Sequence, residues 1–419
     1  MNFRKTFSSL KHRNFRLFVC GQSISLIGTW MQMVAVSWLV YRLTNSAFLL
    51  GVVGFSSQVP SFLLAPFAGV FADRYNRHRI LLMVQVFSLV QAVIMAWLVV
   101  TNSINIVQII TLSFFLGLVN AFDLPVRQSF ISEMIDDRKD LSNAIALHSS
   151  LYNGSRLFGP ALAGVVIAVM GEGWCFVLNA LSFLPIIIAL WMMRFPLKNK
   201  EQLPHKKVNS ALKEGIRYAF HFMPIRTLLV TLAVVSFLTG MVQTLMPVFV
   251  KDIYHGGPKA LGFVLSMSGV GALCGALYLA GRQTVVGLGR LIGFSSIILG
   301  FVFVSLGLIT NLWLAGISAL LMGLVMILAI SSVNVILQTL VEENMRGRVM
   351  SLYGAALIGM APLGSLAAGW LAGKIGLSLT MVLGSGVAFL ASFIYWQNYP
   401  LFRSQIRTVY AQKGIIPEA

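Results

Sequence analysis

The chain has very little charge for its length. Of its 419 residues only 11% are Asp, Glu, Lys or Arg, and only 13 are acidic. A soluble domain carries roughly 25% charged residues, because its surface faces water. Here 57% of the residues are hydrophobic and the mean hydropathy is +0.83. This composition excludes an ordinary soluble domain and predicts a chain whose surface faces hydrocarbon.

Cysteine is scarce, and the common motifs of enzymes are missing. Cys20, Cys175 and Cys274 are scattered without CxxC spacing, which argues against a disulfide framework and against a metal site. The sequence contains no GxxxxGK[ST], no HExxH, no nucleophile elbow and no paired-carboxylate site. We therefore expect neither an enzyme nor an ATP-driven pump, and no bound cofactor or metal.

Long apolar segments make up most of the chain. The first, from Phe15 to Tyr41, exceeds the roughly 20 residues that cross a bilayer, so we interpret it as a retained span and expect no cleaved signal peptide. Because the segments are continuously apolar and hydrocarbon cannot pair free backbone groups, we predict helices and not strands. The fold class is an all-α polytopic membrane protein with twelve spans: 15–41, 47–72, 79–101, 106–126, 143–170, 173–194, 226–250, 261–281, 289–310, 312–339, 349–373 and 377–400.

One long, basic connection separates two sets of six spans. Within it, Leu212, Ile216, Ala219 and Phe220 recur at helical spacing, which predicts an amphipathic surface helix. The halves resemble each other faintly and favour a duplicated bundle with a site between its halves. We predict an N-terminal six-helix half, a central loop, a C-terminal six-helix half and a tail, with bounds 1–194, 195–225, 226–402 and 403–419.

The positive charge is distributed unevenly among the connections. The chain carries 31 Lys and Arg and a net charge of +18. Nearly all of these residues fall on one side of the membrane if both termini and the central loop lie there, which is the bias that marks the cytoplasmic side. We therefore expect a multi-pass protein of a bacterial-type inner (plasma) membrane with cytoplasmic termini. The distribution argues against nucleic acid as a partner and favours contact with membrane lipids.

A charged motif lies between the second and third spans. Its sequence, GVFADRYNRHR from Gly69 to Arg79, resembles the cytoplasmic signature GxxxD[RK]xG[RK][RK] of the major facilitator superfamily. Asn76 replaces a glycine of that signature, and we expect it to keep a left-handed turn. The alternative is an ordinary basic loop. The resemblance implies the major facilitator fold of two pseudo-symmetric six-helix bundles, with a conformational gate that includes Gly69, Asp73, Arg74 and Arg77.

A second motif lies in the fifth span. The run GSRLFGPALAG from Gly154 to Gly164 resembles the GxxxGPxxGG element of drug:proton antiporters. Pro160 removes a helical hydrogen bond and Gly159 permits a bend, so the resemblance adds both residues to the gate. The alternative is a seam of small residues that packs helices together.

Residues 120–164 extend this resemblance to the subgroup that holds enterobactin-exporter-like and macrolide-efflux proteins. It implies a monomeric secondary active transporter that works by alternating access. The transporter would export a siderophore-like or drug-like small molecule, driven by the proton gradient. A lysophospholipid or lipid flippase and a solute uptake symporter of the same fold are the alternatives.

Few polar side chains lie inside the spans. Asp123 is the only acid well inside one, and Arg156 is the only basic residue near the middle of one. Buried charge is costly unless it is paired or solvated, so both are candidates for function. We expect Arg156 to bind an anionic group of the substrate, while Asp123 either carries a proton or forms a structural ion pair with Arg127.

Other candidates for the substrate and proton pathway carry no fixed charge, and among them His148 could titrate near neutral pH. Two of them lie on the polar face of the fifth span, and two lie at matched positions of the first and seventh spans. For the histidine and the two glutamines, a packing role is an equal alternative to a role in the pathway. They are His148 at the edge of that face, Tyr152, Asn153, Gln32 and Gln243. Tryptophans such as Trp30 are assigned to the interfacial belt.

Overall fold

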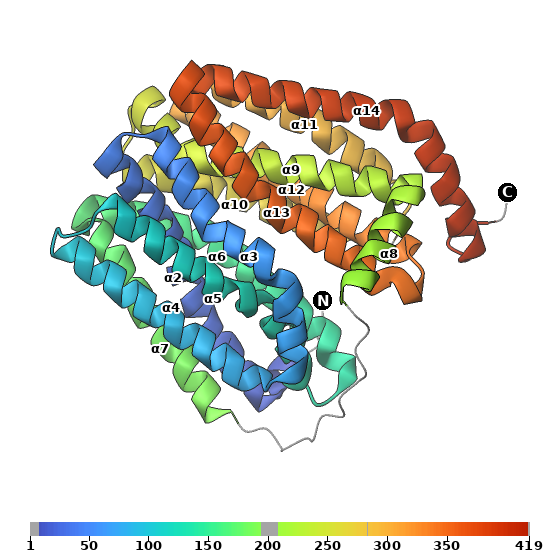
Figure 1. Cartoon of the computed structure of the whole chain (residues 1–419), viewed down its shortest axis with the longest axis horizontal. Coiled ribbons are helices and arrows are strands. Elements are labelled where there is room, and N and C mark those ends of the chain that lie inside the picture. Colours follow the sequence, from blue (N-terminus) through green and yellow to red (C-terminus); the bar gives the residue numbers. More distant parts are fainter. Residues whose placement is uncertain (1–7, 194–207, 283, 418–419) are drawn as a thin grey trace. The chain divides into compact units, whose positions relative to one another are not determined.

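The computed structural model describes residues 8–193, 208–282 and 284–417, and within these ranges every regular element is a helix (Figure 1). The elements up to residue 193 are η1 (Ser8–Lys11), α2 (Arg13–Thr44), α3 (Ala47–Arg74), α4 (Arg77–Val100), α5 (Ile106–Glu133), η2 (Arg138–Asp140), α6 (Leu141–Met170) and α7 (Glu172–Met192). The later ones are α8 (Val208–His221), α9 (Met223–Val248), the π-helical η3 (Phe249–Ile253), α10 (Pro258–Ala280), α11 (Leu288–Leu308), α12 (Leu312–Leu340), α13 (Glu343–Ile375) and α14 (Leu377–Gln412).

The predicted fold class is confirmed. Twelve helices of the described chain are long and apolar enough to cross a membrane. Polar residues begin several of them: Ser46 accepts a hydrogen bond from the N–H of Leu49, and Asn105 forms a capping box with Gln108. These caps satisfy amide groups that a helix leaves free at its first turn. The last helix continues to Gln412, so the first ten residues of the predicted tail are helical.

Two connections reveal the internal duplication in their backbone geometry. Gly171 joins α6 to α7 with φ 88° and ψ 168°, and Gly376 joins α13 to α14 with φ 85° and ψ 167°. Residues other than glycine rarely adopt this region, so each turn needs glycine at this position. The same turn therefore joins the fifth span to the sixth and the eleventh span to the twelfth.

The chain forms two compact units. Unit 1 comprises Met1–Gln202 and Met246–Gly269, and unit 2 comprises Leu203–Leu245 and Val270–Ala419. The core of unit 1 includes Phe130, and that of unit 2 includes Ile336. The predicted division of the chain at residues 194 and 226 stays a prediction, since contacts within the structure place the start of α10 in unit 1.

The predicted amphipathic helix is α8, and it packs on the start of α13 (Figure 1). Gly215 faces α13 so closely that an added Cβ would lie 2.9 Å from the Cβ of Arg348. Arg348 also pairs with Glu214 at 2.9 Å. On the predicted apolar face Ala219 is buried, whereas Ile216 and Phe220 are 42% and 53% exposed. These two side chains are available to an apolar phase outside unit 2.

A polar contact holds η1 against the start of α6 in unit 1. The Asp140 carboxylate lies 2.6 Å from Lys11 Nζ and 3.1 Å from a ring nitrogen of His12. Hydrogen bonds from Lys11, Ser8 and His12 hold the pKa of Asp140 well below its usual range, and the same carboxylate raises the pKa of Lys11. A depressed carboxyl pKa contributes stability above the pKa of the unfolded chain, about 3.9, and this stability is lost as the pH falls from there towards the lower pKa of the folded chain.

We expect acid to release η1 from the start of α6. Purified Asp140→Asn protein should have a lower Tm than the wild type at pH 7. The difference should shrink steadily below about pH 4, because the unfolded wild-type chain then takes up a proton that the folded chain still excludes. Asp137→Asn removes an acid of the same connection that forms no ion pair with Lys11 or His12, so it should change the profile much less than Asp140→Asn does. A Tm difference that stays constant over the pH range would contradict this role.

Candidate functional site

The side chain of Arg156 lies beside aromatic rings in unit 1. Its guanidinium carbon is 6.0 Å from the ring centroid of Trp30 on α2. The ring of Tyr152, one turn earlier on α6, contacts the same Trp30 edge-on at 5.9 Å. Tyr152 is 46% exposed, and no carboxylate of the described residues forms an ion pair with Arg156. An aromatic face stabilises a guanidinium without neutralising it, so the charge remains available to an anion.

Trp30 is a site residue that the sequence analysis missed. We assigned it to the interfacial belt, but the structure places it against Arg156 and Tyr152. It also lies against Gly159, where an added Cβ would collide with the Cβ of Trp30. The sequence offered one signal against the belt, because Trp30 lies near the middle of the predicted span 15–41 and the belt lies at span ends.

Asp123 pairs with Arg127, one turn later on α5. The structure thus gives Asp123 the partner that the sequence left open, and that partner is not Arg156. The pair is incomplete, because Asp123 Oδ1 and Arg127 Nε are buried without a hydrogen-bond partner in the described chain.

His148 on α6 adds a third polar group to this pair. Its ring stacks on Phe18 at 6.1 Å, and the charges of Arg127 and Asp123 both act on it. His148 Nε2 is likewise buried without a partner among the described residues. Buried polar atoms are nearly always paired, so these three atoms are exceptions among the described residues.

Gln32 belongs to a buried hydrogen-bond network. Its side-chain amide donates to Gln91 Oε1 at 2.9 Å, and its oxygen accepts from Asn179 Nδ2 at 2.7 Å. Ser182 completes the network by donating to Asn179. This network joins α2, α4 and α7 and occupies most of the hydrogen-bonding capacity of Gln32. Its role toward a substrate stays a prediction.

The remaining candidates of the pathway are placed differently. Gln243, at the matched position on α9, is exposed in unit 2. Asn153 donates its amide to the carbonyl of Ser149 on its own helix, at 2.9 Å. The structure therefore does not place the two glutamines in equivalent surroundings, and it ties Asn153 to its helix backbone.

The first predicted gate motif lies at the end of α3 and the start of α4. The surroundings of Gly69 and the side chains of Asp73 and Arg74 lie outside what the structure describes, and Arg77 pairs with Glu133 at 2.8 Å. The expectation of a left-handed turn at Asn76 is wrong. Its φ is −68°, and its side chain caps α4 by accepting from the N–H of Arg79. A cap requires a short polar side chain, which explains why asparagine fits here.

The second predicted gate motif forms a close seam between α6 and the first half of α10. An added Cβ at Gly262 would lie 2.5 Å from the carbonyl oxygen of Pro160, and one at Gly164 would lie 2.7 Å from that of Pro258. Because Pro160 has no N–H, the helix is locally weakened there. Ser266 supplies an interhelical hydrogen bond to the carbonyl of Leu157 at 2.9 Å. The packing alternative is thus observed, and the gating role of Gly159 and Pro160 stays a prediction.

Polar contacts also join the end of α2 to η3 within unit 1. Tyr41 donates a hydrogen bond to Asp252, and Lys251 Nζ lies 2.7 Å from Asn45 Oδ1. Lys251 also lies 5.0 Å from the ring centroid of Tyr41. The sequence analysis missed this cluster, because its members are distant in the sequence and occur at the ends of two separate spans.

Comparison with known proteins shows relatives over nearly the full length. The chain is 25% identical to the "Staphyloferrin A transporter" of Staphylococcus aureus (strain NCTC 8325 / PS 47), covering 92% of this chain and 96% of that protein. It is 24% identical to the "Multidrug efflux pump Tap" of Mycolicibacterium fortuitum, covering 85% of this chain and 88% of that protein.

Solved structures show the same fold. A bacterial homologue of the human lysosomal transporter Spinster, inward-facing and unoccupied, superposes with a TM-score of 0.70 at 14% identity over 93% of this chain and 98% of that chain. A single-residue mutant of the nucleoside transporter NupG gives 0.75 at 11% identity over 92% and 98%. The profile described as "Transmembrane secretion effector" matches residues 4–413. The protein therefore belongs to this transmembrane secretion effector family of the major facilitator superfamily, and it is a membrane transporter and not an enzyme.

Proposed function

We propose that this transporter is a proton-coupled exporter of a siderophore-like or drug-like small molecule that bears an anionic group. The observation that carries the proposal is the charge of Arg156, which has no ion-pair partner among the described residues and lies beside Trp30, whose ring Tyr152 contacts edge-on. A ligand with an anionic group and an apolar or aromatic body matches both features. The names of the relatives, a staphyloferrin A transporter and a multidrug efflux pump, support export of such molecules.

Arg156 would bind the anionic group directly. An arginine stays charged at every physiological pH, so Arg156 serves as a substrate-binding residue and not as a proton carrier. Its planar guanidinium can donate two parallel hydrogen bonds to a carboxylate or phosphate. Trp30 holds the guanidinium from one side, which limits the entropy lost when a substrate binds.

The proton would bind at the cluster of Asp123, Arg127 and His148. Protonation of Asp123 weakens its attraction to Arg127, and His148 is close enough for both charges to act on it and has a buried ring nitrogen without a partner among the described residues. Arg127 then has a charge without a full counter-charge, which favours a rearrangement of α5 against α6. Proton uptake at this cluster and substrate release at Arg156, both involving α6, would thereby be coupled through one helix.

The test of substrate binding uses Arg156→Gln and Arg156→Lys in proteoliposomes. A charge-assisted hydrogen bond contributes about 1.5–3 kcal/mol, so we expect Arg156→Gln to lower the transport rate of a carboxylate-bearing siderophore, such as staphyloferrin A, about tenfold or more. Arg156→Lys should keep part of the rate, because a point charge survives without the planar fork.

Arg282 provides the matched control, since its guanidinium also lies near an aromatic ring, 5.9 Å from the centroid of Tyr278. Arg282→Gln should leave the rate within about twofold of the wild type. If Arg156→Gln transports the siderophore normally but is less stable, Arg156 is structural. Ethidium transport would then favour a neutral or cationic drug as the substrate.

The test of coupling separates proton-driven transport from exchange. Asp123→Asn and His148→Gln should each lower transport driven by a pH gradient about tenfold, because the proton site is lost, while exchange of labelled for unlabelled substrate without a gradient continues. Glu172→Gln is the control, because Glu172 also pairs with an arginine, Arg42, at 2.7 Å but at the start of α7. Equal loss of exchange and of driven transport would mean that the pair is only structural.

Export also requires the proposed orientation, with both termini in the cytoplasm, which the uneven distribution of Lys and Arg supports. In a chain without its native cysteines, Thr284→Cys should react with an impermeant maleimide only in inverted vesicles. Ser103→Cys should react from outside intact cells. Both positions are exposed. The opposite pattern would reverse the topology.

A further inference from the structure

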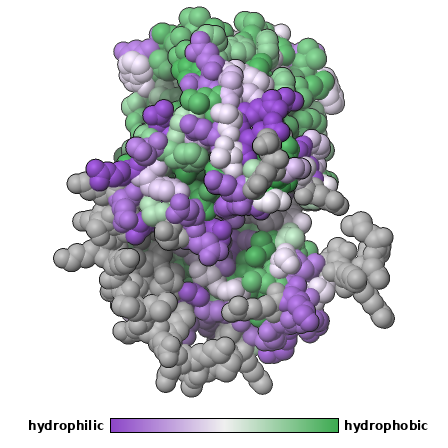
Figure 2. All heavy atoms as spheres, turned by 90° about the vertical axis from the view of Figure 1, so that its right-hand side faces the viewer, coloured by the Kyte–Doolittle hydropathy of each residue, from purple (hydrophilic) through white to green (hydrophobic). Residues whose placement is uncertain are grey.

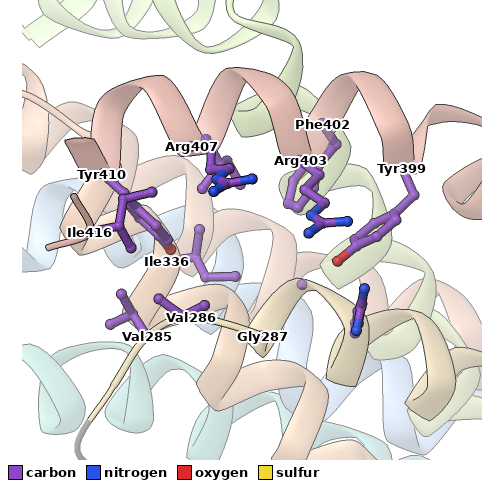
Figure 3. A pocket seen from close by; sticks show the side chains of 13 residues that line it. Val285, Val286, Gly287, Ile336, Tyr399, Phe402, Arg403, Arg407, Tyr410 and Ile416 are labelled. Carbon is purple, nitrogen blue, oxygen red and sulfur yellow. The ribbon is translucent and has the colours of Figure 1, made fainter. Parts of the chain in front are cut away.

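A basic cavity lies in unit 2, away from the groups assigned to transport. Its volume is about 300 Å³, and it lies between α14, the start of α11 and the turn that precedes α11 (Figure 3). Three arginines line it, Arg290, Arg403 and Arg407, and none of the 13 lining residues is acidic. On the face of the molecule towards which α14 ends, hydrophilic side chains are interspersed with hydrophobic ones (Figure 2).

The sequence of α14 explains why charge and apolar surface meet here. Phe402, Ile406 and Tyr410 are at most 6% exposed and pack into the core of unit 2. Arg403 and Arg407 follow two of them and stand one turn apart, and both are exposed. Figure 3 shows the two arginines projecting from α14 above the turn that holds Val285, Val286 and Gly287.

The arginines have no counter-charge in the described chain, in which none of the three forms an ion pair. Like charges four residues apart on a helix repel each other. The first turn of α11 adds the positive end of a helix dipole, because Gly287, with φ 89°, begins that helix at the cavity. A bound anion would relieve this repulsion, and the paired guanidiniums match the oxygens of a phosphate group.

We propose that this cavity binds the phosphate group of an anionic phospholipid. Apolar side chains, among them Val285, Val286 and Ile336, line the cavity beside the arginines, so it offers contacts to an acyl chain as well as to a headgroup. Arg403 and Arg407 follow the last predicted span, 377–400, directly, so we expect them at the level of the lipid headgroups. The site goes beyond the proposed export function and does not depend on the transported substrate. A soluble phosphate ester shares the same chemistry and is separated from a lipid by the experiment.

The experiment counts bound phosphatidylglycerol on the purified full-length protein by native mass spectrometry, with phosphatidylcholine as the neutral-headgroup comparison. Arg403→Gln/Arg407→Gln should bind phosphatidylglycerol about tenfold more weakly than the wild type, and Arg403→Lys/Arg407→Lys should retain part of the binding. The matched control is Arg226→Gln/Arg346→Gln, which removes two exposed arginines of unit 2 outside the cavity. It should bind within about twofold of the wild type.

Three results decide the proposal. Equal loss in the cavity variant and the control variant would overturn it, because any basic surface would then suffice. Equal binding of phosphatidylcholine would overturn the assignment of an anion site. Glycerol 1-phosphate at millimolar concentration should not displace the lipid, and displacement would assign the site to a soluble phosphate ester. The Tm and gel-filtration profile of each variant show that it is folded, and the lysine variant tests the site without removing charge.

Discussion

A bilayer interior offers no water to pair with polar groups, and this single constraint governs most of what the structure shows. It forces the backbone into helices and leaves each buried side-chain donor or acceptor to find a partner within the chain. Gln32, Gln91 and Asn179 satisfy the constraint by bonding to one another across three helices. Asp123 and His148 do not satisfy it, since each keeps a buried atom without a partner in the described chain. The contrast separates a network that stabilises the bundle from the groups to which we assign the proposed proton site.

Much of the fold could be predicted from the sequence, because the same constraint requires long apolar segments that are visible in the composition. Twelve apolar segments had to be helices, and a short connection such as that at Gly171 could join only neighbouring antiparallel spans. Local chemistry was harder to predict. We expected Asn76 to adopt the left-handed backbone conformation of the glycine that it replaces. Its backbone is extended instead, and its side chain caps α4. The helical extension of α14 also escaped prediction, because beyond residue 400 its buried face is defined by packing on unit 2 and not by continuous apolarity.

The candidate site was predictable as a set of residue types and not as a set of contacts. A charged residue inside an apolar segment can be recognised from the sequence alone. Asp123 and Arg156 were predicted as site residues for this reason. The partner of Asp123 could also be named, because Arg127 follows one turn later on the same helix, whereas the partner of Arg156 is Trp30 on another helix. Duplication gave limited help, because the repeats preserve backbone geometry at Gly171 and Gly376 but not the surroundings of the two matched glutamines.

The arginines illustrate how one residue type takes different roles according to its access to water. Arg127 lies inside a span and is held by a carboxylate, whereas Arg156 is held by an aromatic ring and keeps its full charge. Arg403 and Arg407 lie near the end of a span, where water screens their repulsion and lowers the cost of leaving them unpaired. Desolvation would strengthen binding of an anion at Arg156 more than at the exposed pair. The proposed roles differ accordingly: the interior arginine would select the anionic group of a substrate, and the outer pair would bind abundant anionic headgroups.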